Sequence, residues 1–272
     1  MEELYSKMDA LKTFILDKAK NGAVIAFSGG VDSATLAAIS HQVLGQKAVA
    51  VVVQSPLHPV SELVNAKKTA QEIGIALHIV KTEQLKNPDF IKNPVNRCYY
   101  CKKALLYNLS EFAKSHNFEA IFEGTNLTDL TTHRPGFKAI QEIKGVYSPW
   151  VDCKFTKAEI REVAKNLGLK VHGKPAFTCL ATRIQFNDAI TIEKLERIQK
   201  AEQALRRILN SEQIRVRDHN GLARIEVDPS KRNLFCNVQV LDKVAVELKK
   251  LGFKYVTFDL EGYQSGSMLK GV

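Results

Sequence analysis

A segment of small and polar residues near the N-terminus has the composition of an anion-binding loop. Its six residues are Ser28, Gly29, Gly30, Val31, Asp32 and Ser33. Apolar runs on either side predict a strand before the loop and a helix after it. Adjacent glycines let the backbone approach an anion closely, and the first amides of the helix then point at that anion. The serines add hydroxyl donors, whereas Asp32 fits beside a polyanion only if a metal or the turn itself requires it.

The loop differs from the Walker A motif, which would end in Gly-Lys-Ser or Gly-Lys-Thr. Its pattern, Ser-Gly-Gly-x-Asp-Ser, resembles the pyrophosphate loop of enzymes that cleave ATP to AMP and pyrophosphate. The alternative is an ordinary strand-to-helix turn that contains two glycines. A second polar turn, Gly124-Thr125-Asn126, follows another apolar run, and we expect it to face the same site.

Three of the five cysteines could form a metal centre. Cys98 and Cys101 are a CxxC pair at the start of a predicted helix, and Cys179 lies in a loop-like segment that could face the same cleft. Three thiolates are one short of a structural zinc site but suit an iron–sulfur cluster with one iron left free. Two alternatives stay open: a zinc site completed by His133 or His172, and a redox CxxC pair unrelated to Cys179.

The composition is that of a globular chain that can bury a core, with 272 residues, 45% of them hydrophobic. The formal net charge of +10 attracts phosphate-bearing partners, but the lysines are scattered and form no dense basic tract with aromatics. No apolar run approaches the roughly 20 residues of a membrane span. The acidic N-terminus does not resemble a signal peptide. We therefore expect a cytoplasmic protein without disulfides, in which Cys153 and Cys236 are buried thiols.

Strands alternate with helices in the first half of the chain. The expected strands cover 23–27, 48–53, 75–80 and 119–122, and the expected helices cover 4–19, 34–44, 60–73 and 100–115. This order predicts an α/β fold, a parallel sheet with helices on both faces. Ligands of such sheets bind beyond the carboxyl ends of the strands, where both polar turns lie.

The pattern changes in the second half. A segment richer in Pro and Gly, residues 135–190, is expected to link two parts and to contain a helix at 156–167. Beyond it we expect helices at 191–209 and 238–251, strands at 213–218 and 222–227 joined by an Asn-Gly hairpin, and a strand at 254–260. The prediction is an ATP-binding domain, residues 1–150, followed by residues 151–272, a linker with a smaller C-terminal α+β domain.

Several motifs together resemble the LarE family of sulfur transferases, pyrophosphate-loop enzymes that help to make a nickel-pincer nucleotide cofactor. The matching stretches are Ser28 to Ser33, Glu123 to Asn126, Arg134 to Gly136, Cys179 to Ile184, Ile214 to Arg217, Ala223 to Val227 and Asp259 to Ser267. The loop alone is less specific, since NAD and GMP synthetases and tRNA-thiolating enzymes share it. The fold implied is Rossmann-like, of the adenine nucleotide α-hydrolase type.

The resemblance implies an enzyme that uses ATP to adenylate a carboxylate of a pyridinium mononucleotide, after which sulfur displaces AMP and leaves a thiocarboxylate. Members with a single cysteine at the position of Cys179 sacrifice its sulfur. Members with an additional CxxC pair resemble cluster enzymes, in which the open iron of a [4Fe-4S] cluster carries the transferable sulfide. This chain has the three-cysteine pattern, which implies a cluster on Cys98, Cys101 and Cys179. Catalytic roles are expected for Cys179, Asp32 and Arg183, and the resemblance implies that the C-terminal domain within residues 151–272 serves substrate binding and sulfur transfer.

The same resemblance implies the ATP and metal ligands. The residues expected to bind ATP are Ser28, Gly29, Gly30, Val31, Asp32, Ser33, Gly124, Thr125, Asn126 and Asp129. Asp32 and Asp129 are the expected partners of Mg²⁺, directly or through water.

A nucleotide substrate also needs groups that hold its phosphate. Arg215 and Arg217 alternate along a predicted strand, so both point to one face, and Arg224 on the paired strand and Arg183 could join them. The alternative is surface salt bridging with carboxylates such as Glu226.

The expected partners are a small phosphorylated nucleotide and sulfide or another sulfur donor, and we expect a homo-oligomer that does not bind membranes. Glu202 is expected to be a solvated helix residue. Three other functions stay open. A tRNA thiolase is disfavoured because no RNA-binding module or zinc ribbon is recognisable. A non-catalytic sensor would bind nucleotide and cluster without releasing pyrophosphate. An amidotransferase synthetase would need a glutaminase segment, and none is apparent.

Overall fold

The computed structural model describes residues 2–131, 135–174, 178–264 and 266–269. The chain divides into two compact units: residues 1–84 with 96–177, and residues 85–95 with 178–272. Packing therefore keeps residues 151–174 with the first unit. The expected division of function at residue 150, with ATP binding before it and substrate binding after it, stays a prediction.

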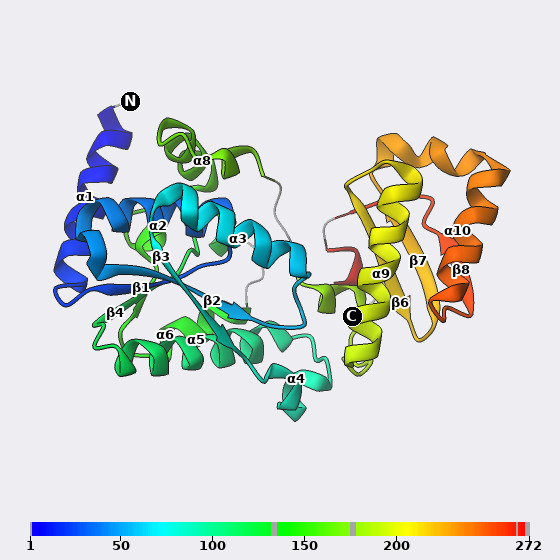
Figure 1. Ribbon diagram of the computed structural model, residues 1–272, viewed down its shortest axis with the longest axis horizontal. Helices are drawn as coiled ribbons and strands as arrows, with labels where there is room; N and C mark the ends of the chain where they lie inside the picture. The colour runs from blue at the N-terminus through cyan, green and yellow to red at the C-terminus, as the bar shows by residue number, and fades with distance from the viewer. Residues whose placement is uncertain (1, 132–134, 175–177, 265, 270–272) are drawn as a thin grey trace. The chain divides into compact units, whose positions relative to one another are not determined.

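The first unit contains a five-stranded parallel sheet in the order β3-β2-β1-β4-β5 (Figure 1). Its strands are β1 (Ala23–Ala26), β2 (Ala48–Gln54), β3 (Ala76–Lys81), β4 (Ala120–Phe122) and β5 (Val146–Tyr147). Ala23 of β1 pairs with Ala48 of β2 on one side and with Ala120 of β4 on the other. The strand order therefore reverses between β1 and β4, which is where ligands of open parallel sheets bind.

Helices cover both faces of this sheet (Figure 1). They are α1 (Glu2–Lys18), α2 (Val31–Leu44), α3 (Val60–Ile73), α5 (Arg97–Ser115), α6 (Pro135–Gln141), α7 (Pro149–Asp152) and α8 (Lys157–Asn166). Successive residues of β1 point to opposite faces, so each face has its own core. Ile25 belongs to the core with α1, α2 and α3, whereas Val24 belongs to the core with α5 and α6.

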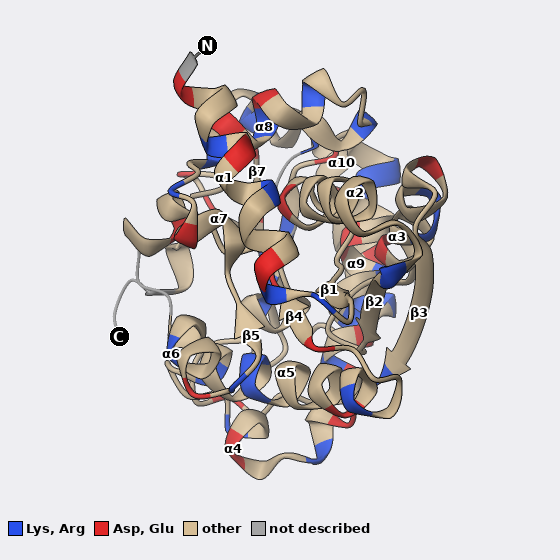
Figure 2. Cartoon of the chain, turned by 90° about the vertical axis from the view of Figure 1, so that its left-hand side faces the viewer, with Lys and Arg blue, Asp and Glu red and all other residues tan. Residues whose placement is uncertain are grey.

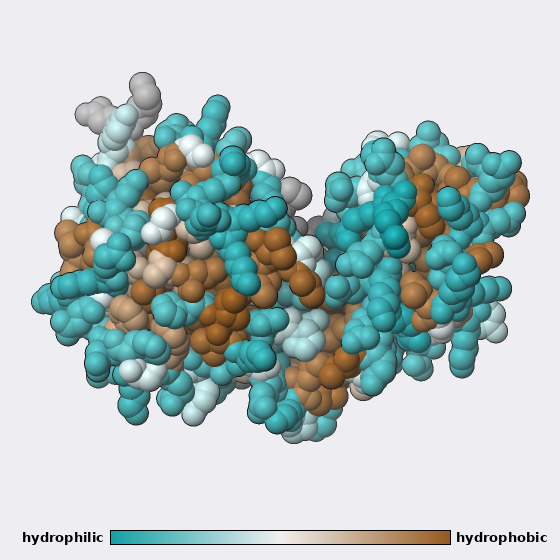
Figure 3. Space-filling view, in the orientation of Figure 1, coloured by the Kyte–Doolittle hydropathy of each residue, from teal (hydrophilic) through white to brown (hydrophobic). Residues whose placement is uncertain are grey.

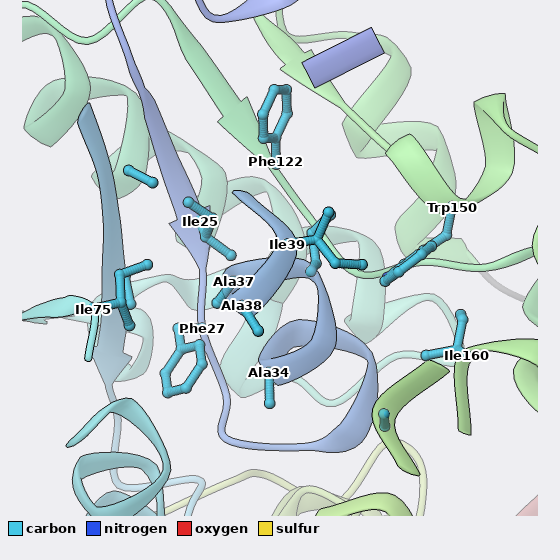
Figure 4. Packing of buried hydrophobic residues seen from close by; sticks show 14 of the residues in the cluster. Ile25, Phe27, Ala34, Ala37, Ala38, Ile39, Ile75, Phe122, Trp150 and Ile160 are labelled. Atoms are coloured by element: carbon cyan, nitrogen blue, oxygen red, sulfur yellow. The ribbon is translucent and has the colours of Figure 1, made fainter. Parts of the chain in front are cut away.

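The core on the α2 side contains many small side chains. Figure 4 labels Ile25 and Phe27 beside Ala34, Ala37, Ala38 and Ile39 of α2. The alanines allow α2 to lie close to the sheet, and this closeness fixes the loop that precedes the helix. Trp150 of α7 closes the same core and is fully buried.

The second unit is a three-stranded sheet with two long helices. Its strands are β6 (Ile214–His219), β7 (Leu222–Val227) and β8 (Tyr255–Phe258), and its helices are α4 (Pro88–Ile91), α9 (Ile192–Leu209) and α10 (Val238–Lys250). β6 and β7 are antiparallel, whereas β7 and β8 are parallel. Asn220 and Gly221 form the predicted two-residue turn, with φ of 55° and 96°.

Short 3₁₀ helices complete both units: η1 (Gly45–Lys47), η2 (Gln84–Lys86), η3 (Leu127–Thr131), η4 (Lys170–Gly173), η5 (Leu180–Arg183), η6 (Pro229–Cys236) and η7 (Ser267–Leu269).

The fold class is as the sequence predicts, with one correction. Residues 135–152, expected to be part of a linker, supply α6, β5 and α7 to the first unit. The prediction was wrong here because a two-residue strand and a four-residue helix are too short to give a periodic signal. In addition, α2 begins at Val31, three residues earlier than predicted, since the last loop residues already form its first turn.

The surface carries both polar and apolar groups. On the side shown in Figure 2, basic and acidic residues are interspersed. Val60 and Val64 of α3 and Ile79 of β3 are exposed apolar side chains of the first unit. Figure 3 shows apolar areas among the hydrophilic ones on the side that faces the viewer. A helix with the length and hydropathy of a membrane span does not occur in the described part of the chain.

The two loop glycines differ in their surroundings, which yields a matched test. Gly29 has a φ of +70°, and a Cβ there would lie 2.8 Å from the Cα of Ala66. At Gly30 the φ is −85°, and a Cβ would meet the Oγ of Ser28 at 3.4 Å. We predict that Gly29→Ala lowers the free energy of unfolding by about 1–3 kcal/mol, while Gly30→Ala changes it by less than about 0.5 kcal/mol. Equal losses in urea unfolding would contradict this account.

Candidate active site

The loop at residues 28–33, here called the pyrophosphate loop, is held by its own serines at the carboxyl end of β1. The Ser33 Oγ accepts a hydrogen bond from the Ser28 amide at 3.1 Å and donates to the Gly30 carbonyl at 3.2 Å. The two serine hydroxyls lie 3.0 Å apart. Gly30 caps α2 without a side chain, so the amides at the helix start are suited to an external anion.

The turn after β4, residues 123–126, contacts the pyrophosphate loop through Asn126. The fully buried Asn126 donates from Nδ2 to Asp32 Oδ1 at 3.3 Å and to Asp129 Oδ2 at 2.9 Å. Gly124 permits this approach, because a Cβ there would lie 3.2 Å from the Cβ of Asp32. The structure thus brings together four of the predicted ATP-binding residues, Asp32, Gly124, Asn126 and Asp129. The carboxylates of Asp32 and Asp129 both accept from the side-chain amide of Asn126. Paired carboxylates of this kind suit Mg²⁺.

Lys157 also faces Asp32, although the sequence analysis did not single it out. It is the first residue of α8, and its ammonium forms an ion pair with Asp32. Its backbone amide donates to Thr128 Oγ1 at 3.0 Å, which fixes the start of α8 to the same region. Trp150 Nε1 donates to the main-chain oxygen of Asp32 at 3.2 Å. The capping box that begins at Thr156 was visible in the sequence and could have indicated that Lys157 opens a helix.

Glu123 is a buried carboxylate at the start of the β4 turn, with 1% of its surface exposed. It accepts hydrogen bonds from Thr125 Oγ1 at 2.7 Å, from Lys102 Nζ at 2.7 Å and from Ser148 Oγ. Burial raises the pKa of Glu123, but the Lys102 ammonium and these hydrogen bonds outweigh burial and hold the pKa below its usual value. The ionised carboxylate thereby fixes Thr125 and connects the turn to α5.

The predicted cluster cysteines are thiols accessible at least in part. Cys98 is exposed and Cys101 half-buried, and both lie near the start of α5, one helical turn apart on the same face. Half-buried Cys179 is the residue that caps η5. Helix starts favour thiolates, the form that binds metals. The CxxC pair belongs to the first unit and Cys179 to the second.

Other possible metal ligands give no further site. His133 lies outside the described residues, and His172 lies in η4 of the first unit. In the part of the chain that the structure describes, no group of three or more His, Cys, Asp or Glu side chains is arranged to hold a metal ion. The pKa of Cys153 is raised to about 11 by burial and by the charge of Asp152, which makes it an unreactive thiol. Cys236 is exposed at the end of η6, so its predicted burial was wrong.

The strand arginines share one face of the second sheet, as predicted. The strand register pairs Arg215 with Glu226 and Arg217 with Arg224. Arg217 donates to the buried Glu226 at 2.7 Å, and Arg224 donates to Asp259 at 3.0 Å. Salt bridging with Glu226 therefore occurs, but in the interior and not on the surface.

These arginines retain unused donors. Among the described residues, the buried Nε atoms of Arg215, Arg217 and Arg224 have no hydrogen-bond partner. The guanidinium of Arg215 lies 5.3 Å from the ring centre of Tyr263. Burial lowers the pKa of Arg215, and the nearby positive charge of Arg183 lowers it further. Because unpaired buried donors are costly, a face with three of them is suited to an anion such as phosphate.

Arg183 makes its hydrogen bonds to the turn that carries Cys179. It is fully buried, with Nη1 at 2.9 Å from the Thr178 carbonyl and 3.0 Å from the Cys179 carbonyl. Its Nε donates to Glu202 Oε1 at 2.8 Å, and Glu202 also accepts from the Val216 amide at 3.3 Å. Glu202 is 2% exposed, so its predicted solvation was wrong. Its partners come from other segments of the chain, and helical periodicity could not show them.

Sequence comparisons agree with the class that the fold and loop define. Residues 3–90 match a family model described as NAD synthase. The B subunit of a glutamine-hydrolysing GMP synthase from Archaeoglobus fulgidus is 26% identical, over 69% of this chain and 65% of its own length. The chain therefore contains a domain of the pyrophosphate-loop ATPase class.

Longer matches identify the family. An uncharacterised protein of Synechocystis is 42% identical over 97% of both chains, and one of Methanocaldococcus jannaschii is 33% identical over 95% of this chain and 98% of its own. The pyridinium-3,5-bisthiocarboxylic acid mononucleotide synthase of Lactiplantibacillus plantarum is 33% identical over 90% of this chain and 87% of its own. The chain belongs to the family of that synthase, the LarE family of ATP-using sulfur transferases.

The buried Glu123 generates a pH-dependent prediction. Glu123→Gln leaves Lys102 without its counter-charge, so we expect the free energy of unfolding at neutral pH to fall by about 1–3 kcal/mol. A lowered folded-state pKa contributes stability above the unfolded-state value of about 4.3, and the contribution disappears as pH falls through the folded-state pKa. The difference between wild type and variant should be constant from neutral pH to about pH 5 and shrink below it.

Urea unfolding at a series of pH values measures this difference. Glu111→Gln, at an exposed position of α5, the helix that carries Lys102, is the control and should change stability little. A Glu123→Gln difference that stays constant or grows as the protein is acidified would contradict the assignment.

Proposed function

We propose that the chain adenylates a carboxylate of a pyridinium mononucleotide with ATP and replaces one carboxylate oxygen by sulfur. The carboxylate oxygen attacks the α-phosphorus, and the bond to the bridging oxygen breaks, which releases pyrophosphate. A sulfur nucleophile then attacks the acyl carbon, and the C–O bond to AMP breaks. The products are a thiocarboxylate, AMP and pyrophosphate, and a thiocarboxylated pyridinium mononucleotide is the product in the name of the Lactiplantibacillus relative.

The observation that carries the ATP half of this proposal is the arrangement around Asp32. The pyrophosphate loop offers amides for phosphate oxygens, and Asp32 and Asp129 converge on Asn126, where Mg²⁺ could join them. Lys157 supplies a cation at the same carboxylate. We propose that the loop amides and Lys157, together with a Mg²⁺ ion that the two carboxylates would hold, stabilise the negative charge that develops on departing pyrophosphate.

The acceptor phosphate is assigned to the strand arginines. Arg215, Arg217 and Arg224 present buried, unused Nε donors from one sheet face, and arginine forks match phosphate geometry. Tyr263, stacked on Arg215, supplies an aromatic surface next to them. Arg183 is assigned a positioning role, because it holds the turn of Cys179 through two main-chain carbonyls.

The sulfur is assigned to a centre on Cys98, Cys101 and Cys179. The donor set fits a [4Fe-4S] cluster, since none of the three cysteines is joined in a disulfide, none is fully buried and two lie one turn apart at a helix start. When bound, such a cluster would supply the transferable sulfur. Cys153 does not fit this role because of its raised pKa.

The products of ATP cleavage test the first step. Incubation with the pyridinium dicarboxylate mononucleotide should yield AMP and pyrophosphate in equal amounts. Asp32→Asn keeps the shape of the side chain and an oxygen that can accept from Asn126, but it removes the charge, so turnover should fall by a factor of about 100 or more. Stability should fall by about 1 kcal/mol or less, because both partners of the lost ion pair with Lys157 are partly exposed. The exposed variant Asp17→Asn is the control. Release of ADP and inorganic phosphate in the presence of acceptor would overturn the proposal.

Separate titrations of acceptor and ATP test the arginine site. Arg215→Ala removes charge-assisted donors, so acceptor binding should weaken by roughly 1.5–3 kcal/mol, while ATP binding stays unchanged. Arg215 is the cleaner position, because removal of Arg217 leaves the buried Glu226 without its partner. Arg207→Ala, at an exposed position on α9, is the control. If Arg215→Ala loses ATP affinity and keeps acceptor affinity, the arginine belongs to the ATP site.

Iron analysis tests the cluster. Anaerobic reconstitution should give a brown protein with about four irons per chain. Single alanine replacements of Cys98, Cys101 or Cys179 should lose the iron, whereas Cys153→Ala and Cys236→Ala should keep it. A colourless protein with one zinc per chain would refute the assignment, and dispensable Cys98 and Cys101 would indicate a sacrificial Cys179 instead.

A further inference from the structure

A buried amide lies against the sulfur of Cys101. Gln84, the first residue of η2, is 4% exposed and belongs to the same compact unit as Cys101. Its Nε2 lies 3.2 Å from the Sγ of Cys101 and 3.2 Å from the Cys101 carbonyl oxygen. The amide therefore holds both the side chain and the main chain of this cysteine.

The orientation of the Gln84 amide follows from its neighbours. A carbonyl oxygen can only accept a hydrogen bond, so the group that faces the Cys101 carbonyl must be the NH₂ end. The opposite end, Oε1, accepts from Ser55 Oγ at 2.8 Å. An N–H donor thus points toward the sulfur, where it stabilises negative charge on a thiolate.

Gln84 is itself anchored to the loop that follows β2. Ser55 is 6% exposed, and its Oγ also accepts from the amide of the fully buried Leu57 at 3.2 Å. β2 is the neighbour of β1, whose loop is assigned to ATP. A chain of buried hydrogen bonds therefore runs from Ser55, in the loop after β2, through Gln84 to Cys101. Cys98, in contrast, is exposed to solvent.

We infer that Gln84 is a positioning residue that fixes the Cys101 sulfur and donates a hydrogen bond to it, so that the two cysteines of the CxxC pair are chemically unequal. The inference rests on the proposed function only in treating Cys101 as a ligand of the sulfur-transfer centre. Outer hydrogen bonds to ligand sulfurs tune metal centres and orient their ligands.

The first test uses the full-length protein without metal, under anaerobic conditions. Gln84→Met keeps the length of the side chain but removes the donor. Alkylation by iodoacetamide at one fixed pH, followed by mass spectrometry of the peptides, reports Cys98 and Cys101 separately. We expect the Cys101 rate to fall several-fold relative to Cys98, because the thiolate loses its donor. Gln71→Met, at an exposed position on α3, should leave the ratio unchanged.

A second variant and a second readout guard against a purely structural effect. Ser55→Ala leaves the amide in place but removes its anchor, so it should shift the same ratio in the same direction by a smaller factor. Should Gln84→Met not fold, Ser55→Ala decides the question. In reconstituted protein, Gln84→Met should also move the reduction potential of the centre to a more negative value, because the donor stabilises the reduced state.

The outcomes separate this inference from the proposed function. An unchanged Cys101-to-Cys98 ratio in the folded variants overturns the role of Gln84, whatever the iron content. If the ratio changes but the wild-type protein takes up no iron on anaerobic reconstitution, the role of Gln84 is supported and the cluster is refuted.

Discussion

The contact between Asp32 and Asn126 is the constraint on which the rest of the first unit depends. It joins the loops after β1 and β4 at the position where the strand order reverses. Several features of the sequence serve this contact. Gly124 removes a side chain that would meet Asp32, the alanines of α2 bring the helix close to the sheet, and Lys157 balances the charge. A pair of loops held in this way can present phosphate-binding amides and carboxylates without first having to order them.

The second unit buries several cationic side chains, among them Arg183, Arg215 and Arg217. Arg217 and Arg224 have carboxylate partners, but these do not use all of their donors. A protein selected for stability alone would gain from replacing such groups with apolar side chains. Their presence is understandable if an anion completes the site. Arg183 differs from them, because it donates to Glu202 and to the Thr178 carbonyl and so has a structural role.

The parts of this arrangement that follow from local sequence could be predicted. The helix α3 has its predicted bounds, the Asn-Gly turn forms as expected, and the pyrophosphate loop lies between a strand and a helix. What failed depends on contacts between distant segments. Glu202 is buried because Arg183 and Val216 come to it from other elements, and β5 exists because β4 offers an edge to pair with. Lys157 and Gln84 lie in unremarkable sequence contexts, and only the folded chain places them on Asp32 and Cys101.

The central claim is that ATP activation serves the exchange of oxygen for sulfur on a carboxylated nucleotide. The most direct measurement is mass spectrometry of the pyridinium dicarboxylate mononucleotide after anaerobic incubation with the reconstituted protein, ATP, Mg²⁺ and sulfide. The account predicts a product in which one carboxylate oxygen is replaced by one sulfur, formed together with one AMP. Cleavage of ATP with the nucleotide recovered unchanged, or sulfur found in co-purified RNA instead, would contradict it.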